Sequence, residues 1–530
     1  MMEEPLTKPN VVLIVLDTLR ADRMSCYGYG RRTTPFIDAF AEDATVFERA
    51  VVPGQWTIPS HASLFTGEYP TTHMTNQIYD SVGDDLTTLA ELLRADGYRT
   101  VGFCNNPLLG VVDNELEHGF EEFYNYGGAV PNYPDLARAQ PRAFARLAER
   151  LTHVIRRLTA PFQNQFAHNN ALLRIAMHPW IVPLWQGSVN FKGNTKRSLH
   201  DVVRYLRVHR ASNDESPIFA FINLMETHLP YQPPARFTRK LAPYYEDDTE
   251  AKTFMEGYNR EHYRWMIPLT EPLGEVEDRV LNDLYDAEVA YQDRLLRRLL
   301  KDLNKPGARD DTMVIITSDH GEGLNNHDFV GHSLVAYDDL VRTPLVIRYP
   351  RQYPAGKRVS SVVSTRRVFH AVLDAAGVQP TESRGNGGGP DEIQALTLTQ
   401  ELNGSASKEA TVFAEAYTPA TLLALMENET PSAIETFRCR SMRRAAYAGR
   451  HKLITVGDEP DELFDVIADP GETDNLLSAH PDKVEELDQA LTHFIADAEN
   501  RRPANWESAR KVSLDDEEIS ERLRALGYIE

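Results

Sequence analysis

Cysteine is scarce in this chain. The 530 residues include three cysteines, Cys26, Cys104 and Cys439, which stand far apart and form no Cys-x-x-Cys pair. Disulfide-stapled domains and structural zinc sites need several closely spaced cysteines. The sequence therefore argues against both kinds of stabilisation.

Basic residues are also in deficit. Lys and Arg together number 56 against 78 Asp and Glu, which gives a formal net charge of −22. Nucleic-acid backbones select basic surfaces, so we expect no nucleic-acid partner. The deficit does not exclude an anionic substrate, because a bound divalent cation can reverse the local field.

Long apolar runs are missing too. No stretch approaches the roughly 20 apolar residues that a membrane-spanning helix needs. The apolar run at residues 11–16 is too short for the core of a signal peptide, and Glu3 and Glu4 precede it. The sequence predicts no integral membrane segment and a cytoplasmic location.

Three short apolar runs are typical of buried strands in a parallel sheet, and they lie at residues 11–16, 218–224 and 313–318. Acidic residues and histidines follow them, namely Asp17, His228, Asp319 and His320. Open α/β sheets place their functional sites at the carboxyl ends of such strands. Helical patterns over residues 86–96 and 281–302 separate the runs. We therefore expect an α/β fold with its site at one edge of the sheet.

The chain is too long for one compact core, and its patterns predict two parts and a tail. We expect residues 8–385 to form the catalytic α/β domain, residues 386–500 a small antiparallel-sheet subdomain, and residues 501–530 a charged tail. A stretch rich in Gly and Pro at 382–391 predicts the junction. Residues 131–200 break the strand–helix pattern and predict a helical insertion, for which a membrane-contacting or substrate-covering role stays open.

The segment Thr57-Ile-Pro-Ser-His61 offers a candidate nucleophile. A hydroxyl at a Pro-containing helix start can face outward while helix N-terminal amides help to bind an anion. The same pattern is also typical of helix capping, so it does not suffice alone.

Asp17, Asp319 and His320 are candidate ligands for one divalent cation over the Thr57 oxygen. Such an ion would lower the pKa of the hydroxyl and neutralise a tetrahedral anion, with Thr57 itself completing the ligand set. Oxygen ligands suit Ca²⁺, Mg²⁺ or Mn²⁺, and the imidazole also admits Zn²⁺.

Five motifs along the chain resemble the sulfatase family of the alkaline phosphatase superfamily. In order they are the strand and aspartate at 10–22, the Tyr-Gly-Tyr-Gly and Thr-Pro pairs at 27–35, the segment 57–67, the Ser-Asp-His-Gly-Glu stretch at 318–322 with 341–345, and the Glu-Leu-Phe-Asp and Asp-Pro-Gly-Glu stretches at 462–476. The resemblance implies a large mixed sheet sandwiched by helices, followed by a small α+β subdomain with an antiparallel sheet.

Four departures from the family pattern bear on the chemistry. Thr57 stands where sulfatases carry a Cys or Ser that is oxidised to formylglycine, so no formylglycine is expected. A threonine ester must be opened by attack of water or another acceptor on the central atom, which phosphoryl intermediates commonly undergo. His61 replaces an arginine, Thr18 replaces a second aspartate ligand, and residues 105–110 lack the lysine and histidine that would bind sulfate. The departures favour phosphate over sulfate esters.

The remaining site candidates are mostly histidines. His228 lies in a segment similar to the family's His-Pro segment, and we expect it to donate to a substrate oxygen or to protonate the leaving group, unless it is a core histidine. His332 stands near the place of a family lysine and is expected to be a general acid or a ligand. Paired with His327, it could hold a second metal. His61, Asn106 and His327 form the expected substrate-binding set.

The leading hypothesis is a metal-dependent hydrolase of phosphate mono- or diesters or of sulfate esters, with Thr57 as nucleophile. One alternative is a transferase that moves a phospho-group to a glycan or lipid acceptor, and another is a non-catalytic anion- or partner-binding domain. The expected substrate is a small-molecule, glycan or lipid ester. The oligomeric state stays open.

Overall fold

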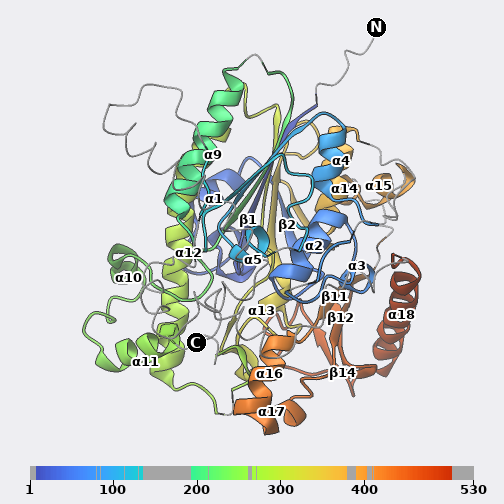
Figure 1. Cartoon of the computed structure of the whole chain (residues 1–530). Coiled ribbons are helices and arrows are strands. Elements are labelled where there is room, and N and C mark those ends of the chain that lie inside the picture. Colours follow the sequence, from blue (N-terminus) through green and yellow to red (C-terminus); the bar gives the residue numbers. More distant parts are fainter. Residues whose placement is uncertain are drawn as a thin grey trace, which may run out of the picture.

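The computed structural model describes residues 8–134, 192–378, 390–402, 409 and 411–503, apart from short gaps at 79, 84, 113, 129–130, 213, 261–264 and 270. Its main element is an eight-stranded sheet with the order β10-β2-β9-β6-β1-β5-β3-β4 (Figure 1). The strands are β1 (Asn10–Leu16), β2 (Thr45–Val51), β3 (Arg99–Cys104), β4 (Glu122–Asn125), β5 (Ile218–Leu224), β6 (Thr312–Thr317), β9 (Arg342–Arg348) and β10 (Arg358–Ser364).

The sheet is mixed. β1 runs parallel to its neighbours β5 and β6, and β3 runs parallel to β4 and β5. β9 is antiparallel to both β2 and β6. The parallel centre of the sheet therefore brings the carboxyl ends of β1, β5 and β6 together.

Both faces of the sheet are covered, which explains why the central strands are apolar throughout. In β1, Val12, Ile14 and Leu16 point into one core and Val11, Leu13 and Val15 into the other. The first core lies under α1 (Pro35–Ala41), α9 (Thr195–Arg210) and α12 (Glu275–Leu303), and the second under α2 (Thr57–Thr66), α4 (Leu89–Ala95) and α14 (Arg367–Ala376). Figure 1 shows the two helical layers on opposite sides of the sheet.

A second, four-stranded antiparallel sheet forms the small subdomain, with strands β11 (Val412–Ala416), β12 (Arg443–Ala448), β13 (His451–Val456) and β14 (Glu459–Asp465) in that order. One of its faces packs on α18 (Pro481–Asn500), where Leu453 and Leu463 meet Leu487 and Leu491. Its other face packs against the larger part of the chain, in a core that Ile454 shares with Val52.

Shorter elements connect these layers. They are η1 (Ala21–Arg23), η2 (Ser25–Tyr27), α3 (Pro70–His73), α5 (Pro107–Gly110), α10 (Ala235–Leu241), α11 (Thr249–Arg260), β7 (Gly323–Leu324), η4 (Asn326–Asp328), β8 (Val330–Gly331), α13 (Asp338–Val341), α15 (Pro390–Leu396), η5 (Leu398–Leu402), α16 (Ala420–Glu429) and α17 (Pro431–Thr436). Among the described residues, no helix has both the length and the hydropathy needed to cross a bilayer.

The predicted fold class is confirmed, whereas two element boundaries differ from the sequence analysis. α4 begins at Leu89 rather than at residue 86, because the side chains of Thr88 and Glu91 form a capping box there. α12 begins at Glu275, six residues before the predicted start, and Glu277 caps it by accepting from the Gly274 amide.

The structure describes only part of the segments on which the expected division of the chain depends. Most of the predicted insertion at 131–200, the 382–391 junction up to residue 389, and the tail from residue 504 onward lie outside the described residues. Residues 195–200 begin α9, a helix of the main core. Ile393 of α15 and Leu398 of η5 also pack into the core of the large sheet, although both follow the expected boundary at 385.

Candidate active site

The metal-ligand candidates meet at the carboxyl edge of the large sheet. Asp17 directly follows β1, and Asp319 and His320 follow β6, the neighbouring parallel strand. Each of the three offers one ligand atom, and these atoms all lie within 4.8 Å of one another. All three side chains are buried. The structure thus brings together the residues that the sequence predicts as ligands.

The donor set fits a divalent cation. Within the described part of the chain, neither Asp17 Oδ1 nor Asp319 Oδ2 receives a hydrogen bond, although both atoms are buried. His320 Nε2 lies 3.9 Å from Asp17 Oδ1 and 3.5 Å from Asp319 Oδ2. Buried carboxylate oxygens without a donor are costly, and a hard cation with oxygen and imidazole ligands removes that cost.

Burial dominates the protonation of these groups. Desolvation, followed by the charge of Asp319, raises the pKa of Asp17 to about 6, and burial also raises the pKa of Asp319. Desolvation and the neighbouring His332 lower the pKa of His320 to about 4. At neutral pH the imidazole is therefore neutral, which is the form that binds metals.

Thr57 lies next to these ligands. It is the first residue of α2, and its Oγ1 is 3.4 Å from His320 Nε2. The N-cap residue Trp56 makes no side-chain hydrogen bond to this first turn, and Ser60 in the same turn donates to the Asp319 carbonyl. The predicted nucleophile and the predicted metal ligands therefore share one site.

Asn106 orients Asp17. Its Nδ2 donates to Asp17 Oδ2 at 2.8 Å, and its Oδ1 accepts from the Leu108 amide at the start of α5. Asn223, the polar residue near the end of β5, donates to the same Asp17 oxygen at 3.3 Å. The structure thus places Asn106, an expected substrate-binding residue, as a support of a metal ligand.

His61 also supports the ligands. It is completely buried, with Nδ1 donating to the Thr57 carbonyl at 2.8 Å and lying 3.6 Å from Asp319 Oδ2. Its ring contacts Phe65 and Phe221 edge-on. This location favours a role in holding Thr57 and Asp319 over the expected contact with substrate.

Three histidines gather at the site. The ring of His332 lies 4.6 Å from that of His320 and 4.9 Å from that of His228, measured between centroids. His228 Nδ1 donates to the Leu229 carbonyl. Burial and the charge of His332 lower the pKa of His228 well below its usual range. The structure therefore brings His228 and His332 into one cluster with the metal-ligand candidate His320.

Glu322 orients His332 and was not predicted as a site residue. His332 Nδ1 lies 2.9 Å from Glu322 Oε1, and Tyr231 donates to the other carboxylate oxygen at 3.0 Å. Burial alone would lower the pKa of His332, but the charge of Glu322 and the hydrogen bond to it outweigh burial and raise that pKa. The signal in the sequence was the glutamate that ends the Asp-His-Gly-Glu stretch.

His327 lies elsewhere. Its ring stacks on Tyr337 with centroids 3.7 Å apart, and both residues line a cavity of about 220 Å³ between the larger part and the small sheet. Other lining residues, such as Arg443 and Glu462, come from the small sheet. The described residues therefore do not place His327 with His332 in a second metal cluster.

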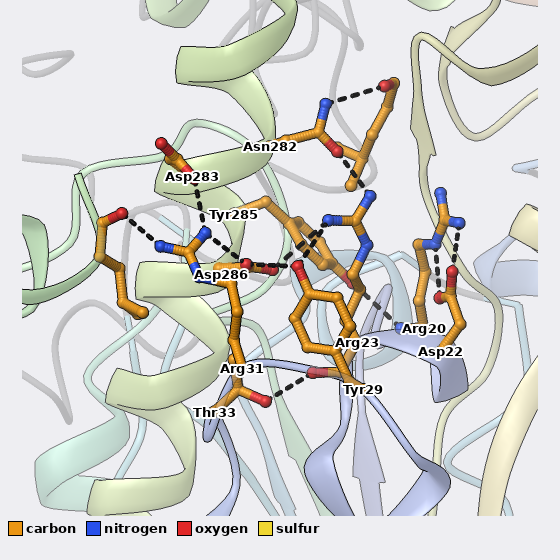
Figure 2. A network of polar contacts seen from close by, with 12 residues as sticks. Arg20, Asp22, Arg23, Tyr29, Arg31, Thr33, Asn282, Asp283, Tyr285 and Asp286 are labelled. Carbon is orange, nitrogen blue, oxygen red and sulfur yellow. Dashed lines mark hydrogen bonds and ion pairs between the residues drawn. The ribbon is translucent and has the colours of Figure 1, made fainter.

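One face of α12 holds the loop that follows β1. The Tyr285 hydroxyl donates to the Thr18 carbonyl at 2.7 Å and accepts from the Arg20 amide at 3.0 Å. Thr18 has φ 59°, a strained value for a β-branched residue. Figure 2 shows the rest of this contact, in which Arg23 and Arg31 of the loop reach Asp286 of the helix.

The same face of α12 holds the loop that carries His228. Gln292 accepts from the Glu226 amide at 3.1 Å, and its Nε2 donates to Thr227 Oγ1, which in turn donates to the Asp17 carbonyl. Glu288 accepts from the Gln232 amide at 2.7 Å and from Lys192 at 3.1 Å. The polar residues at 285, 288 and 292 are spaced so that they lie on one face of the helix. This spacing is the feature of the sequence that could have indicated a polar, loop-binding face of α12.

Comparisons with known proteins show the family of the chain. The sulfatase family model matches residues 9–378. An ulvan-active sulfatase of Formosa agariphila is 24% identical over 93% of this chain and 82% of its own length. YidJ, an uncharacterized sulfatase of Escherichia coli, is 23% identical, and the match spans 65% of this chain but only 64% of YidJ.

Solved structures share the fold. The phosphonate monoester hydrolase of Agrobacterium radiobacter superposes with a TM-score of 0.62 at 20% identity, covering 93% of this chain and 96% of that one. Another phosphonate monoester hydrolase, from Silicibacter pomeroyi, gives a TM-score of 0.60 at 19% identity. The family match, the shared fold and the buried ligand cluster lead to one conclusion: the chain belongs to the sulfatase family, and it is an ester hydrolase with an alkaline phosphatase-like α/β fold.

Proposed function

We propose that the protein is a divalent-metal-dependent hydrolase of phosphate esters and that Thr57 is its nucleophile. The observation that carries the proposal is the place of Thr57 Oγ1, 3.4 Å from His320 Nε2. Asp17 and Asp319, each with a buried oxygen that lacks a donor in the described residues, complete the cluster. A hydroxyl in this position is ready for activation as a nucleophile.

A cation held by Asp17, Asp319 and His320 would supply positive charge to an ester oxygen and to the Thr57 oxygen. The chain's own groups then perform two displacements. Thr57 attacks phosphorus through a deprotonated Oγ1, the bond to the leaving oxygen breaks, and His332 gives that oxygen a proton. Water then attacks the phosphothreonine, His332 takes a proton from the water, and the bond from phosphorus to Thr57 breaks, which restores the deprotonated Oγ1.

His332 suits the acid–base task because Glu322 holds its Nδ1 and raises its pKa. A histidine whose pKa is raised by a neighbouring carboxylate can protonate a leaving group and afterwards accept a proton from water. His228, whose pKa is lowered, stays neutral, and because its Nδ1 proton is donated to the Leu229 carbonyl, its Nε2 can only accept a hydrogen bond, such as one from the attacking water.

The choice of phosphate rests on the chemistry of Thr57. Threonine carries a methyl group on its hydroxyl-bearing carbon, so the formylglycine route to sulfate release is closed to it. A phosphothreonine can be opened by water at phosphorus. The two phosphonate monoester hydrolases of the same fold support this class of substrate, and the organic part is proposed to be a small molecule, a glycan or a lipid.

Sulfate-ester hydrolysis is the second candidate, because the ulvan-active sulfatase matches over most of both chains. A screen of nitrophenyl phosphate, bis-nitrophenyl phosphate, nitrophenyl phosphonate and nitrophenyl sulfate, each with Mg²⁺, Mn²⁺, Ca²⁺ or Zn²⁺, separates the two. We expect a phosphorus ester to dominate and chelation to abolish its turnover. Dominant sulfate turnover, or an aldehyde at residue 57 in the intact mass, would refute the proposal.

A further inference from the structure

The metal loop, residues 318–322, is held by the backbone of α13. The Gly321 amide donates to the Leu340 carbonyl at 2.7 Å, and the Glu322 amide donates to the Asp339 carbonyl at 3.0 Å. A Cβ at position 321 would lie only 1.9 Å from the Asp339 oxygen, so the two backbones are in direct contact. Any shift of α13 therefore moves the residues next to Asp319 and His320.

Arg20 fixes the loop and α13 to each other. Its Nη1 donates to the Glu322 carbonyl at 3.0 Å, and its Nη2 forms an ion pair with Asp339. Arg20 is 2% exposed, so water screens this ion pair little. Through these contacts the metal loop and α13 move together. Contacts at the start of α13 therefore also affect the position of the metal loop.

The small subdomain holds the start of α13 through the Lys452 cluster, which consists of Lys452, Tyr447, Asp338 and Glu472. Asp338, the first residue of α13, accepts from Lys452 Nζ at 3.0 Å and from the Tyr447 hydroxyl at 2.7 Å. Its amide donates to Glu472 at 2.6 Å, and Glu472 also pairs with Lys452. The Lys452 side chain is 0% exposed, so this buried cation joins a carboxyl group of each part.

We propose that Lys452 is a positioning residue of the metal centre, acting from the small sheet through Asp338 and α13 on the loop that carries Asp319 and His320. The inference rests on the proposed function, because it assumes that these two residues bind a metal. Without the Lys452 ammonium, the Asp338 and Glu472 carboxyl groups lose the buried donor that they share, which weakens the contact between the parts. Asp338 and α13 then move, and the ligand loop moves with them.

The test is the affinity of the whole chain for Mn²⁺, measured by titration calorimetry, together with thermal unfolding. We expect Lys452→Met to weaken Mn²⁺ binding by about two- to thirtyfold, the range for residues that act on a site through packed elements. The matched control is Arg450→Met. Arg450 pairs with Asp465 at 2.6 Å on the same hairpin but is half exposed, and we expect unchanged Mn²⁺ affinity.

Each outcome decides the inference. A folded Lys452→Met chain with the affinity of the wild type would overturn it, since a merely structural role lowers the unfolding temperature but leaves affinity intact. If Lys452→Met does not fold, Tyr447→Phe decides, because it removes one hydroxyl from Asp338: weaker Mn²⁺ binding supports the inference and unchanged binding overturns it. A wild-type chain that binds none of the four cations would instead refute the proposed function and remove the premise of the inference.

Discussion

Replacing Gly321 by alanine tests how closely the metal loop and α13 must approach. The added methyl carbon would lie 1.9 Å from the Asp339 carbonyl oxygen. Ordinary carbon–oxygen contacts begin at about 3.3 Å, so the two backbones must separate by about 1.4 Å. The hydrogen bonds from the Gly321 and Glu322 amides, now 2.7 Å and 3.0 Å long, would break.

The cost follows from these contacts. Loss of two backbone hydrogen bonds costs about 0.5–1.5 kcal/mol each, and overpacking adds about 1–3 kcal/mol. Gly321→Ala should therefore lower the free energy of unfolding by about 2–6 kcal/mol. It should also weaken Mn²⁺ binding, because Asp319 and His320 are displaced from Asp17.

Denaturant unfolding and Mn²⁺ titration measure the two effects. Gly257→Ala is the matched control, since no heavy atom lies within 4 Å of a Cβ there and the residue is inside α11. Alanine at that position should stabilise the chain by up to about 1 kcal/mol. If Gly321→Ala unfolds and binds Mn²⁺ as the wild type does, the close contact between loop and α13 does not control the site.

Three further predictions concern the nucleophile, the acid and the buried polar face of α12. Thr57→Ala should lower turnover of the best ester by about a thousandfold or more with Mn²⁺ still bound, whereas Thr57→Ser should keep measurable turnover; near-native turnover of Thr57→Ala would mean that the nucleophile lies elsewhere. His332→Ala should slow esters with poor leaving groups by about 100-fold or more and nitrophenyl esters much less, so an equal loss across a leaving-group series would exclude a general-acid role. Burial raises the pKa of Glu288 from 4.5 to about 7, so its contribution to stability is complete below pH 4.5 and is lost as the pH rises through 7. Between pH 4.5 and 7, the free energy of unfolding of Glu288→Gln should therefore fall less than that of the wild type. If the free energies of the two proteins fall equally over this pH range, Glu288 is not the source of the pH dependence.

The sequence predicted those parts of the site that follow from strand periodicity. The apolar runs around residues 11–16 and 313–318 predicted buried strands of a parallel sheet with their polar residues at one edge. The structure adds that these two strands are neighbours, which places Asp17 beside Asp319 and His320. The small antiparallel sheet was predicted from motifs that resemble a known family, and its existence is confirmed.

Contacts between distant segments could not be predicted in the same way. His61 was expected at the substrate, yet the structure places it between the Thr57 carbonyl and Asp319, because α2 turns that side chain toward the core. His327 was expected beside His332, but a positive φ of 55° occurs at His327 and its ring stacks on Tyr337. Neither backbone conformation nor the packing of one loop on another is encoded in residue spacing.

The polar face of α12 has a consequence for the order of folding. The Arg20 amide donates to the Tyr285 hydroxyl, 265 residues away in the sequence. The Thr18 amide donates to Asp319, 301 residues away. Such distant contacts carry a larger loop-closure cost than the local contacts within helices, so we expect the ligand cluster to form after the helices. A growing chain carries Asp17 early but cannot complete the cluster until residue 320 has been made. Metal capture therefore reports that the segments around residues 17 and 320 have come together, and it cannot direct the first steps of folding.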